Sequence, residues 1–130
     1  MNKILLVDGS NVLHRAYHGL PLLKTSDGRY TNAAYGFMMM LQKILDQEKP
    51  SHIAICFDKG KNTFRHKKFP QYKAQRKPVD PELAEQFPLI REILALNGYR
   101  ILELEEYEAD DIIGTLAHQG QENGNEVMIF

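Results

Sequence analysis

Acidic side chains follow two apolar runs of the sequence, and a third acidic group opens a helix-like segment. Asp8 follows the run 4–7, and Asp58 follows the run 53–57. The third group consists of Glu108, Asp110 and Asp111. Hard divalent cations take oxygen ligands and need negative charge, so carboxylates at the ends of buried strands are suitable ligands for them. The spacing therefore predicts a metal site assembled from acids that are far apart in the chain.

Five acids are more than one ion needs. Two ions roughly 3.5–4 Å apart can hold both the attacking and the leaving oxygen of a phosphodiester, and such a pair requires more carboxylates. On a helix, Glu108 and Asp111 share a face, whereas Asp110 points away from them. A structural alternative stays open: a lone Asp after a strand is often a turn or cap residue. Acids in a first helical turn stabilise it by roughly 0.3–1 kcal/mol each.

Residues 59–77 contain no acid and eight of the chain's 16 lysines and arginines. The eight are Lys59, Lys61, Arg65, Lys67, Lys68, Lys73, Arg76 and Lys77. The aromatic residues Phe64, Phe69 and Tyr72 are interleaved with them. Cations that neutralise phosphates release counterions, and aromatic rings stack on unpaired bases. This stretch predicts a surface for single-stranded or flapped nucleic acid, with a solvated loop as the alternative.

The composition fits one soluble globular domain. The chain has 130 residues, of which 43% are hydrophobic and 25% charged, and its net charge is −1. The net charge of the whole chain therefore does not indicate whether its partner is a polyanion. The single cysteine, Cys56, lies in an apolar run and excludes an intrachain disulfide. No apolar stretch has the length of a signal-peptide core or a membrane span, so we expect a cytoplasmic protein without membrane contact.

Hydrophobic periodicity and turn residues predict strands that alternate with helices. The predicted strands are 4–7, 53–57, 100–104 and 126–130, and the predicted helices are 12–20, 33–48, 81–96 and 110–122. We expect Ser10 or Asn11 to cap the first helix, Asn32 to cap the second and Asp80 the third, which Pro88 should bend or split. Residues 59–81 form a long, partly helical excursion.

Such alternation indicates an α/β fold with a mostly parallel sheet and helices on both faces. Ligands of open parallel sheets bind beyond the carboxyl ends of the strands, which is where Asp8 and Asp58 fall. Glu103 and the two acids at 105 and 106 are interpreted as solvated surface. The chain stops at Phe130, within or just after a strand, so we expect a fragment of a longer domain.

Several ordered motifs resemble the 5′-nuclease domain of bacterial DNA polymerase I, which belongs with the flap endonucleases. The motifs are Leu6-Val7-Asp8-Gly9-Ser10-Asn11, Tyr30-Thr31-Asn32-Ala33-Ala34-Tyr35-Gly36-Phe37, Phe57-Asp58-Lys59-Gly60 with Thr63-Phe64-Arg65-His66, Tyr72-Lys73-Ala74-Gln75-Arg76, and Glu108-Ala109-Asp110-Asp111-Ile112-Ile113-Gly114-Thr115. The resemblance runs from about residue 3 to residue 130. It implies a PIN-like (Rossmann-like) fold.

The resemblance also implies a structure-specific 5′–3′ exonuclease and flap endonuclease that uses two Mg²⁺ or Mn²⁺ ions. Its motifs place metal carboxylates at Asp8, Asp58, Glu108, Asp110 and Asp111. They place phosphate-contacting residues of a helical arch at Lys73 and Arg76, a stacking ring at Tyr72, and a further basic position at Arg15. The implied partner is DNA with 5′ flaps or 5′ ends, including RNA primers in RNA–DNA hybrids, bound by a monomer.

The family pattern continues past the residues present here. It has a Thr-Gly-Asp-x-Asp motif after the strand that resembles 126–130, and later a helix-hairpin-helix element that grips the duplex. Residues 1–130 are thus expected to be the N-terminal portion of the exonuclease domain. Two other functions stay open from the residues alone: a nucleic-acid-binding module without catalysis, and a small PIN-type ribonuclease.

Overall fold

The computed structural model describes residues 2–57, 80–103 and 109–130, except for the side chains of residues 109–111. Four parallel strands form its sheet: β1 (Lys3–Asp8), β2 (His52–Cys56), β3 (Arg100–Leu102) and β4 (Glu126–Ile129). Their order across the sheet is β3-β2-β1-β4. The apolar run of β1 is thus central, and the alternation of strands and helices predicted this parallel arrangement.

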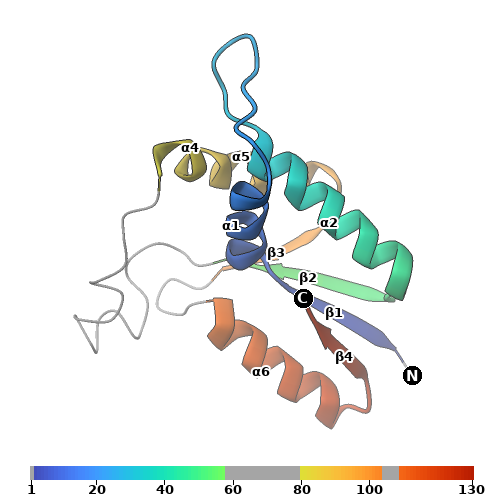
Figure 1. Cartoon of the computed structure of the whole chain (residues 1–130). Helices are drawn as coiled ribbons and strands as arrows, with labels where there is room; N and C mark the ends of the chain where they lie inside the picture. Colours follow the sequence, from blue (N-terminus) through green and yellow to red (C-terminus); the bar gives the residue numbers. More distant parts are fainter. Residues whose placement is uncertain (1, 58–79, 104–108) are drawn as a thin grey trace, which may run out of the picture.

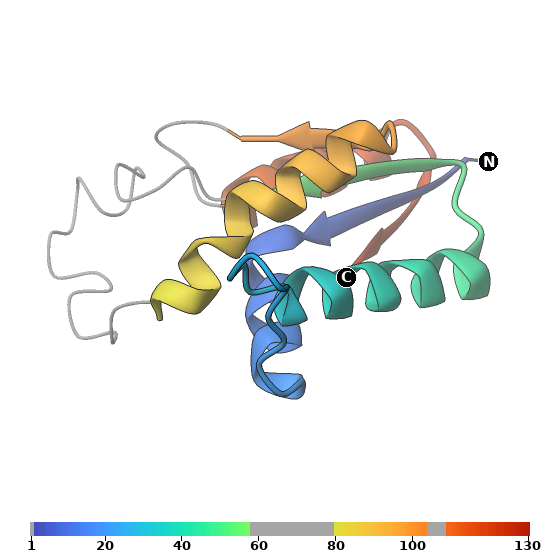
Figure 2. The ribbon, with the colours of Figure 1, turned by 90° about the horizontal axis from the view of Figure 1, so that it is seen from above.

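Helices cover both faces of the sheet, as predicted. Helix α6 (Ala109–Glu122) packs on one face, where Ile112 and Ile113 contact Leu6 and Cys56. The opposite face carries α1 (Gly9–Gly19), α2 (Asn32–Glu48) and α5 (Gln86–Leu96) (Figure 1). Figure 2 shows this second face from above, with α5 lying across the strands. Successive residues of β1 therefore point into different cores, because side chains alternate along a strand.

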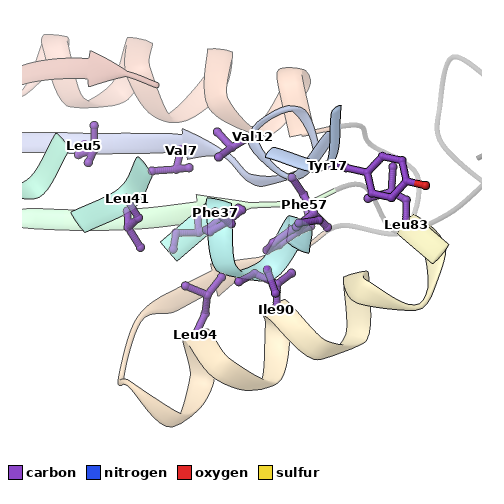
Figure 3. Close-up of a cluster of buried hydrophobic side chains, with 14 residues drawn as sticks. Leu5, Val7, Val12, Tyr17, Phe37, Leu41, Phe57, Leu83, Ile90 and Leu94 are labelled. Carbon is purple, nitrogen blue, oxygen red and sulfur yellow. The ribbon is translucent and has the colours of Figure 1, made fainter. Parts of the chain in front are cut away.

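The larger core lies between the sheet and α1, α2 and α5. Leu5 and Val7 of β1 meet Phe37 of α2 and Ile90 of α5, all fully buried. Figure 3 shows side chains from these elements and from the short helix α4 (Pro81–Ala84) converging on one cluster. This core fixes the strand ends relative to the helices that begin or finish beside them.

The predicted helix over 81–96 is split in two. Helix α4 ends at Ala84, and α5 begins at Gln86. Pro88 explains the break because its ring clashes with the carbonyl of Ala84 four residues earlier and it lacks an N–H to donate there. Asp80 stands at the N-cap position of α4, but its side chain makes no capping hydrogen bond; instead it accepts a hydrogen bond from the Tyr17 hydroxyl at 3.0 Å.

The prediction that Asn32 caps the second helix is wrong. Asn32 is the first residue of α2, and its buried side chain donates to the carbonyl of Tyr17 at 3.2 Å. The cap comes from Gln86, whose Oε1 accepts from the backbone N–H groups of Ala33 and Ala34 at 2.8 and 3.0 Å. Gln86 Nε2 donates in turn to Asn32 Oδ1 at 2.9 Å. A buried amide network therefore ties α5 to the start of α2.

Two glycines with left-handed backbone follow the ends of helices. Gly98 follows α5 with a φ of 81°, and Gly124 follows α6 with a φ of 78°. Such left-handed backbone strongly favours glycine, which ends helices in this way. None of the helices in the described ranges is long and apolar enough to cross a membrane.

Candidate metal centre at the carboxyl end of the sheet

The carboxyl end of the sheet is the end at which β1, β2 and β3 finish, at Asp8, Cys56 and Leu102. Asp8 pairs with Cys56 in the parallel register of β1 and β2. The backbone N–H of Asp8 also donates to the carbonyl of Phe130 at 2.8 Å, which extends the pairing with β4. Asp58 lies outside the described residues, but it follows Cys56 by only two positions. The chain therefore leaves β2 directly beside Asp8.

Asp8 also caps α1. Its Oδ1 accepts a hydrogen bond from the backbone N–H of Asn11 at 3.1 Å, and the helix begins at Gly9. The prediction that Ser10 or Asn11 caps the first helix is wrong, because the aspartate at the strand end caps the helix itself. A carboxylate has two oxygens and about four lone-pair sites, so a capping hydrogen bond leaves capacity for a metal.

The start of α6 lies at the same end of the sheet. Ile112 and Ile113 are buried against Leu6 and Cys56, the residues near the ends of β1 and β2. The backbone of Asp110 and Asp111 immediately precedes them, and Figure 1 shows α6 beginning on the side to which the β1 and β2 arrows point. The side chains of Asp110 and Asp111, and all of Glu108, lie outside what the structure describes.

Arg15 is exposed on α1 and lies beside this end of the sheet. Its guanidinium carbon is 5.3 Å from the centroid of the Phe130 ring, and Phe130 is hydrogen-bonded to Asp8 through its backbone. The structure therefore brings this expected DNA contact close to Asp8. The remaining expected contacts lie outside the described residues: Lys59, Lys61, Arg65, Lys67, Lys68, Tyr72, Lys73, Arg76 and Lys77.

Phe57 joins the elements at the carboxyl end. Its ring is so close to Gly9 that a Cβ atom placed there would lie 2.7 Å from two ring carbons. Only glycine allows α1 to start this near the end of β2. The Phe57 ring also stacks on Phe37, with centroids 6.3 Å apart, and meets Phe87 edge-on at 6.5 Å. The last described residue before Asp58 is thus fully buried and held on several sides.

Arg91 of α5 contacts two of the strand ends. Its guanidinium carbon lies 5.2 Å from the Phe57 ring centroid, and its Nε lies 3.0 Å from Glu103 Oε1. The Glu103 side chain is only 23% exposed. The interpretation of Glu103 as solvated surface is therefore wrong. Sequence spacing gave no signal for this pair, because Arg91 and Glu103 belong to different elements.

Cys56 lies next to Asp8 at the base of the site. Burial, together with a smaller contribution from the negative charge of Asp8, raises the pKa of its thiol to about 11. The thiol therefore stays protonated at neutral pH. Cys56 is a buried apolar residue of β2, as its place in an apolar run predicted.

The donor set suits a hard cation. The five residues expected from the sequence as ligands, at positions 8, 58, 108, 110 and 111, are all carboxylates, and Mg²⁺ or Mn²⁺ prefer such oxygen ligands. Among the described residues, no group of three or more His, Cys, Asp or Glu side chains is placed to hold a metal ion. Asp8 is the single member of the expected set whose side chain falls within that part of the chain.

Comparison with known proteins shows which family has this sequence. Residues 3–130 match the family model of the 5′-3′ exonuclease N-terminal, resolvase-like domain. The chain belongs to this family. It is 55% identical to a DNA polymerase I of Bacillus caldotenax over 98% of its length, and 41% identical to a 5′-3′ exonuclease of Aquifex aeolicus over all of it. It spans 15% and 45% of those two proteins, respectively.

Solved structures of bacteriophage T5 D15 share the fold. A structure of the T5 D15 protein co-crystallised with metal ions superimposes with a TM-score of 0.69 at 22% identity, over 98% of this chain and 48% of that one. A complex of the T5 D15 flap endonuclease with DNA and metal ions gives a TM-score of 0.66 at 20% identity, over 98% of this chain and 47% of that one. The parallel α/β arrangement expected for the 5′-3′ exonuclease family is thereby confirmed.

Proposed function

We propose that this chain forms the metal-binding part of a structure-specific 5′–3′ exonuclease and flap endonuclease acting on DNA, within DNA polymerase I or a stand-alone relative. One observation carries the proposal: Asp8, the exit of β2 towards Asp58 and the start of α6 all lie at the carboxyl end of the sheet. Membership of the 5′-3′ exonuclease family supports it. Three chain segments that are far apart in the sequence therefore meet at this end of the sheet.

The acids Asp8, Asp58, Glu108, Asp110 and Asp111 would hold the ions, as direct ligands or through water. Two Mg²⁺ or Mn²⁺ ions, when bound, supply activation of a water and neutralisation of charge on the phosphate. The oxygen-only donor set favours these cations over zinc. The T5 D15 structure with bound metal ions shares this fold and supports a divalent cofactor.

The rest of the site would bind and orient the DNA strand. Asp8 is held rigidly by β-sheet pairing on its backbone and by its own cap contact, so a ligand at this position needs little reordering. Arg15 presents an exposed cation beside it. Lys73 and Arg76 would stabilise the charge that builds on the scissile phosphate, and Tyr72 would stack on a base. Hydrolysis adds water across the P–O bond and leaves a 5′-phosphate and a 3′-hydroxyl.

The substrate follows from the same features. Eight cations between residues 59 and 77 fit a phosphodiester strand, and the family resemblance selects DNA with 5′ flaps or 5′ ends, including RNA primers in RNA–DNA hybrids. The complex of the T5 D15 flap endonuclease with DNA, which has the same fold, supports a DNA substrate. A cytoplasmic monomer is part of the proposal.

The test is cleavage of a 5′-flap DNA by the full-length protein in Mg²⁺. Asp58→Ala should slow cleavage by about a thousandfold or more, because several kcal/mol of transition-state stabilisation depend on the ions. Asp46→Ala is the matched control, since Asp46 is an exposed acid of α2 whose carboxylate accepts a hydrogen bond from its helical neighbour Gln42. Equal rates for Asp58→Ala and wild type would refute the site.

The same assay separates the rival functions. A module that binds without catalysis would retain salt-sensitive binding to flap DNA and show no cleavage by the wild-type protein. A PIN-type ribonuclease would cleave single-stranded RNA faster than flapped DNA. The proposal requires that the DNA flap is the better substrate.

A further inference from the structure

Arg91 has a combination of contacts that the proposed chemistry does not use. Its guanidinium lies over the Phe57 ring at 5.2 Å and over the Phe87 ring at 5.9 Å, within the range of a cation–π contact. Its Nε lies 3.0 Å from Glu103. The Arg91 side chain is 31% exposed, so this cation is largely removed from water. A partly buried cation is costly to place unless it is paired, and here Glu103 and the two rings are its partners.

The two partners of Arg91 stand where the chain leaves the sheet. Phe57 follows β2 and immediately precedes Asp58, and Glu103 follows β3 and precedes the segment that leads to Glu108. The backbone N–H of Phe57 donates to the carbonyl of Leu102 at 3.0 Å, so the two exits are also joined by the main chain. One arginine from α5 therefore touches both exits, and the core anchors it through Ile90 next to it.

Phe57 also links these contacts to the chain segment that carries Asp8. Its other neighbours include the backbone at Gly9, where added atoms would collide with the ring. Asp8 lies directly before Gly9 and caps the same helix. A shift of the Phe57 ring would therefore move the start of α1 together with the end of β2.

We propose that Arg91 is a positioning residue for the metal site: it fixes the strand exits that carry the acids and contacts neither metal nor DNA. This inference rests on the proposed function. It predicts that loss of Arg91 weakens metal binding because the acids lose their alignment. Outer residues that orient metal ligands typically change affinity by about 10–100-fold, and Arg91 acts through the backbone, so we expect about tenfold.

The sign of the effect separates positioning from simple electrostatics. Arg91→Met removes a positive charge and leaves Glu103 without this partner, so the net charge near the acids becomes more negative. Coulomb attraction alone would then tighten cation binding. Positioning predicts weaker binding instead. Methionine keeps a long apolar side chain against Phe57, which limits the loss of packing.

The experiment measures Mn²⁺ binding to the full-length protein by electron paramagnetic resonance of the free ion, with thermal melting of each variant in parallel. Mn²⁺ binding at the proposed site is defined as the binding that the wild-type protein shows and the Asp8→Asn variant lacks. Arg91→Met should raise the apparent Kd of that binding about tenfold. The Mg²⁺ concentration for half-maximal flap cleavage should rise equally, and the KM for DNA at saturating Mg²⁺ should stay within about twofold.

Arg100→Met is the matched control, because Arg100 is an exposed arginine at the opposite end of β3. Its Mn²⁺ affinity should equal that of wild type. Arg91→Gln supplies a second variant if Arg91→Met does not fold. It removes the same positive charge, so electrostatics alone again predicts tighter Mn²⁺ binding, whereas positioning predicts weaker binding.

Each outcome has one meaning. Unchanged or tighter Mn²⁺ binding in folded Arg91→Met, with normal binding by wild type, overturns the role of Arg91 and leaves the proposed function intact. If only Arg91→Gln folds, its unchanged or tighter binding overturns it equally. A lower melting temperature without a change in Kd shows a structural role and also overturns it. Wild-type protein that neither binds Mn²⁺ at this site nor cleaves flaps overturns the proposed function, and the inference falls with it.

Discussion

The two ends of the sheet are expected to differ in their balance of acids and bases. At the amino end, Lys3 Nζ forms an ion pair with Glu48 Oε2 at 2.9 Å, and the Ser51 hydroxyl donates to the carbonyl of Lys3 at 2.9 Å. Opposite charges meet there and hold β1 against the chain that enters β2. At the carboxyl end, Arg91 and Glu103 form one such pair, but the proposed function also expects acids of three segments to gather there, of which the structure describes the Asp8 side chain.

Collecting charges of one sign destabilises a fold, whereas pairing opposite charges does not. Proteins accept that cost chiefly at functional sites, where perturbed and repelling groups gather. The amino end is therefore interpreted as structure and the carboxyl end as chemistry. Substitutions at the two ends should accordingly separate stability from activity.

The largest effect is expected for Asp8, where two roles can be separated. Asp8→Asn keeps a capping side chain, because Asn and Asp cap helices equally well, whereas Asp8→Ala loses about 1 kcal/mol of stability with the cap. Both should reduce flap cleavage by about a thousandfold or more. Urea denaturation and single-turnover cleavage are the two measurements. An active Asp8→Asn protein would mean that the aspartate is only a cap.

Gly9 tests how tightly the carboxyl end is packed. Gly9→Ala should destabilise the protein by about 1–3 kcal/mol, because its methyl group would collide with the Phe57 ring and force a shift. Gly114→Ala is the control: it lies on α6 with open space around it and should stabilise the helix by up to about 1 kcal/mol. Denaturant melts of both variants give the comparison. Equal stabilities would show that Phe57 is free to move aside.

The smallest effect is expected at the amino end. Lys3→Met with Glu48→Gln removes the ion pair, which is solvent-accessible, so the melting temperature should fall by no more than a few degrees and cleavage should stay within about twofold. The hydrogen bond to Glu48 raises the pKa of Lys3. The contribution of the pair is thus complete below the ordinary lysine pKa and is lost as pH rises through the raised value. A loss of activity at neutral pH would contradict the contrast between the two ends.

Much of the fold could be predicted because local signals agree with the tertiary arrangement. The apolar runs that became β1 and β2, Pro88 inside the third predicted helix, and Gly98 after it each act through their own backbone. The sequence also placed Asp8 at the correct end of the sheet, since parallel strands finish together.

The failures arose where the partner is distant in sequence. Gln86 caps α2 from more than 50 residues away, and that displaced the local prediction for Asn32. Arg91 reaches Phe57 and Glu103 from a different element in each case, so no spacing rule identifies it. The cap of α1 was assigned to Ser10 or Asn11, and a capping role for a strand-ending acid such as Asp8 was considered only as the alternative to metal binding.

The most direct test of the account is an anomalous diffraction map of the full-length protein crystallised with Mn²⁺. The account predicts Mn²⁺ peaks at the carboxyl end of the sheet, coordinated directly or through water by Asp8 together with acids of the 58 and 108–111 segments. Peaks confined to other surfaces, or an Asp8 carboxylate turned away from Asp58 and Asp111 in crystals that contain Mn²⁺, would contradict it.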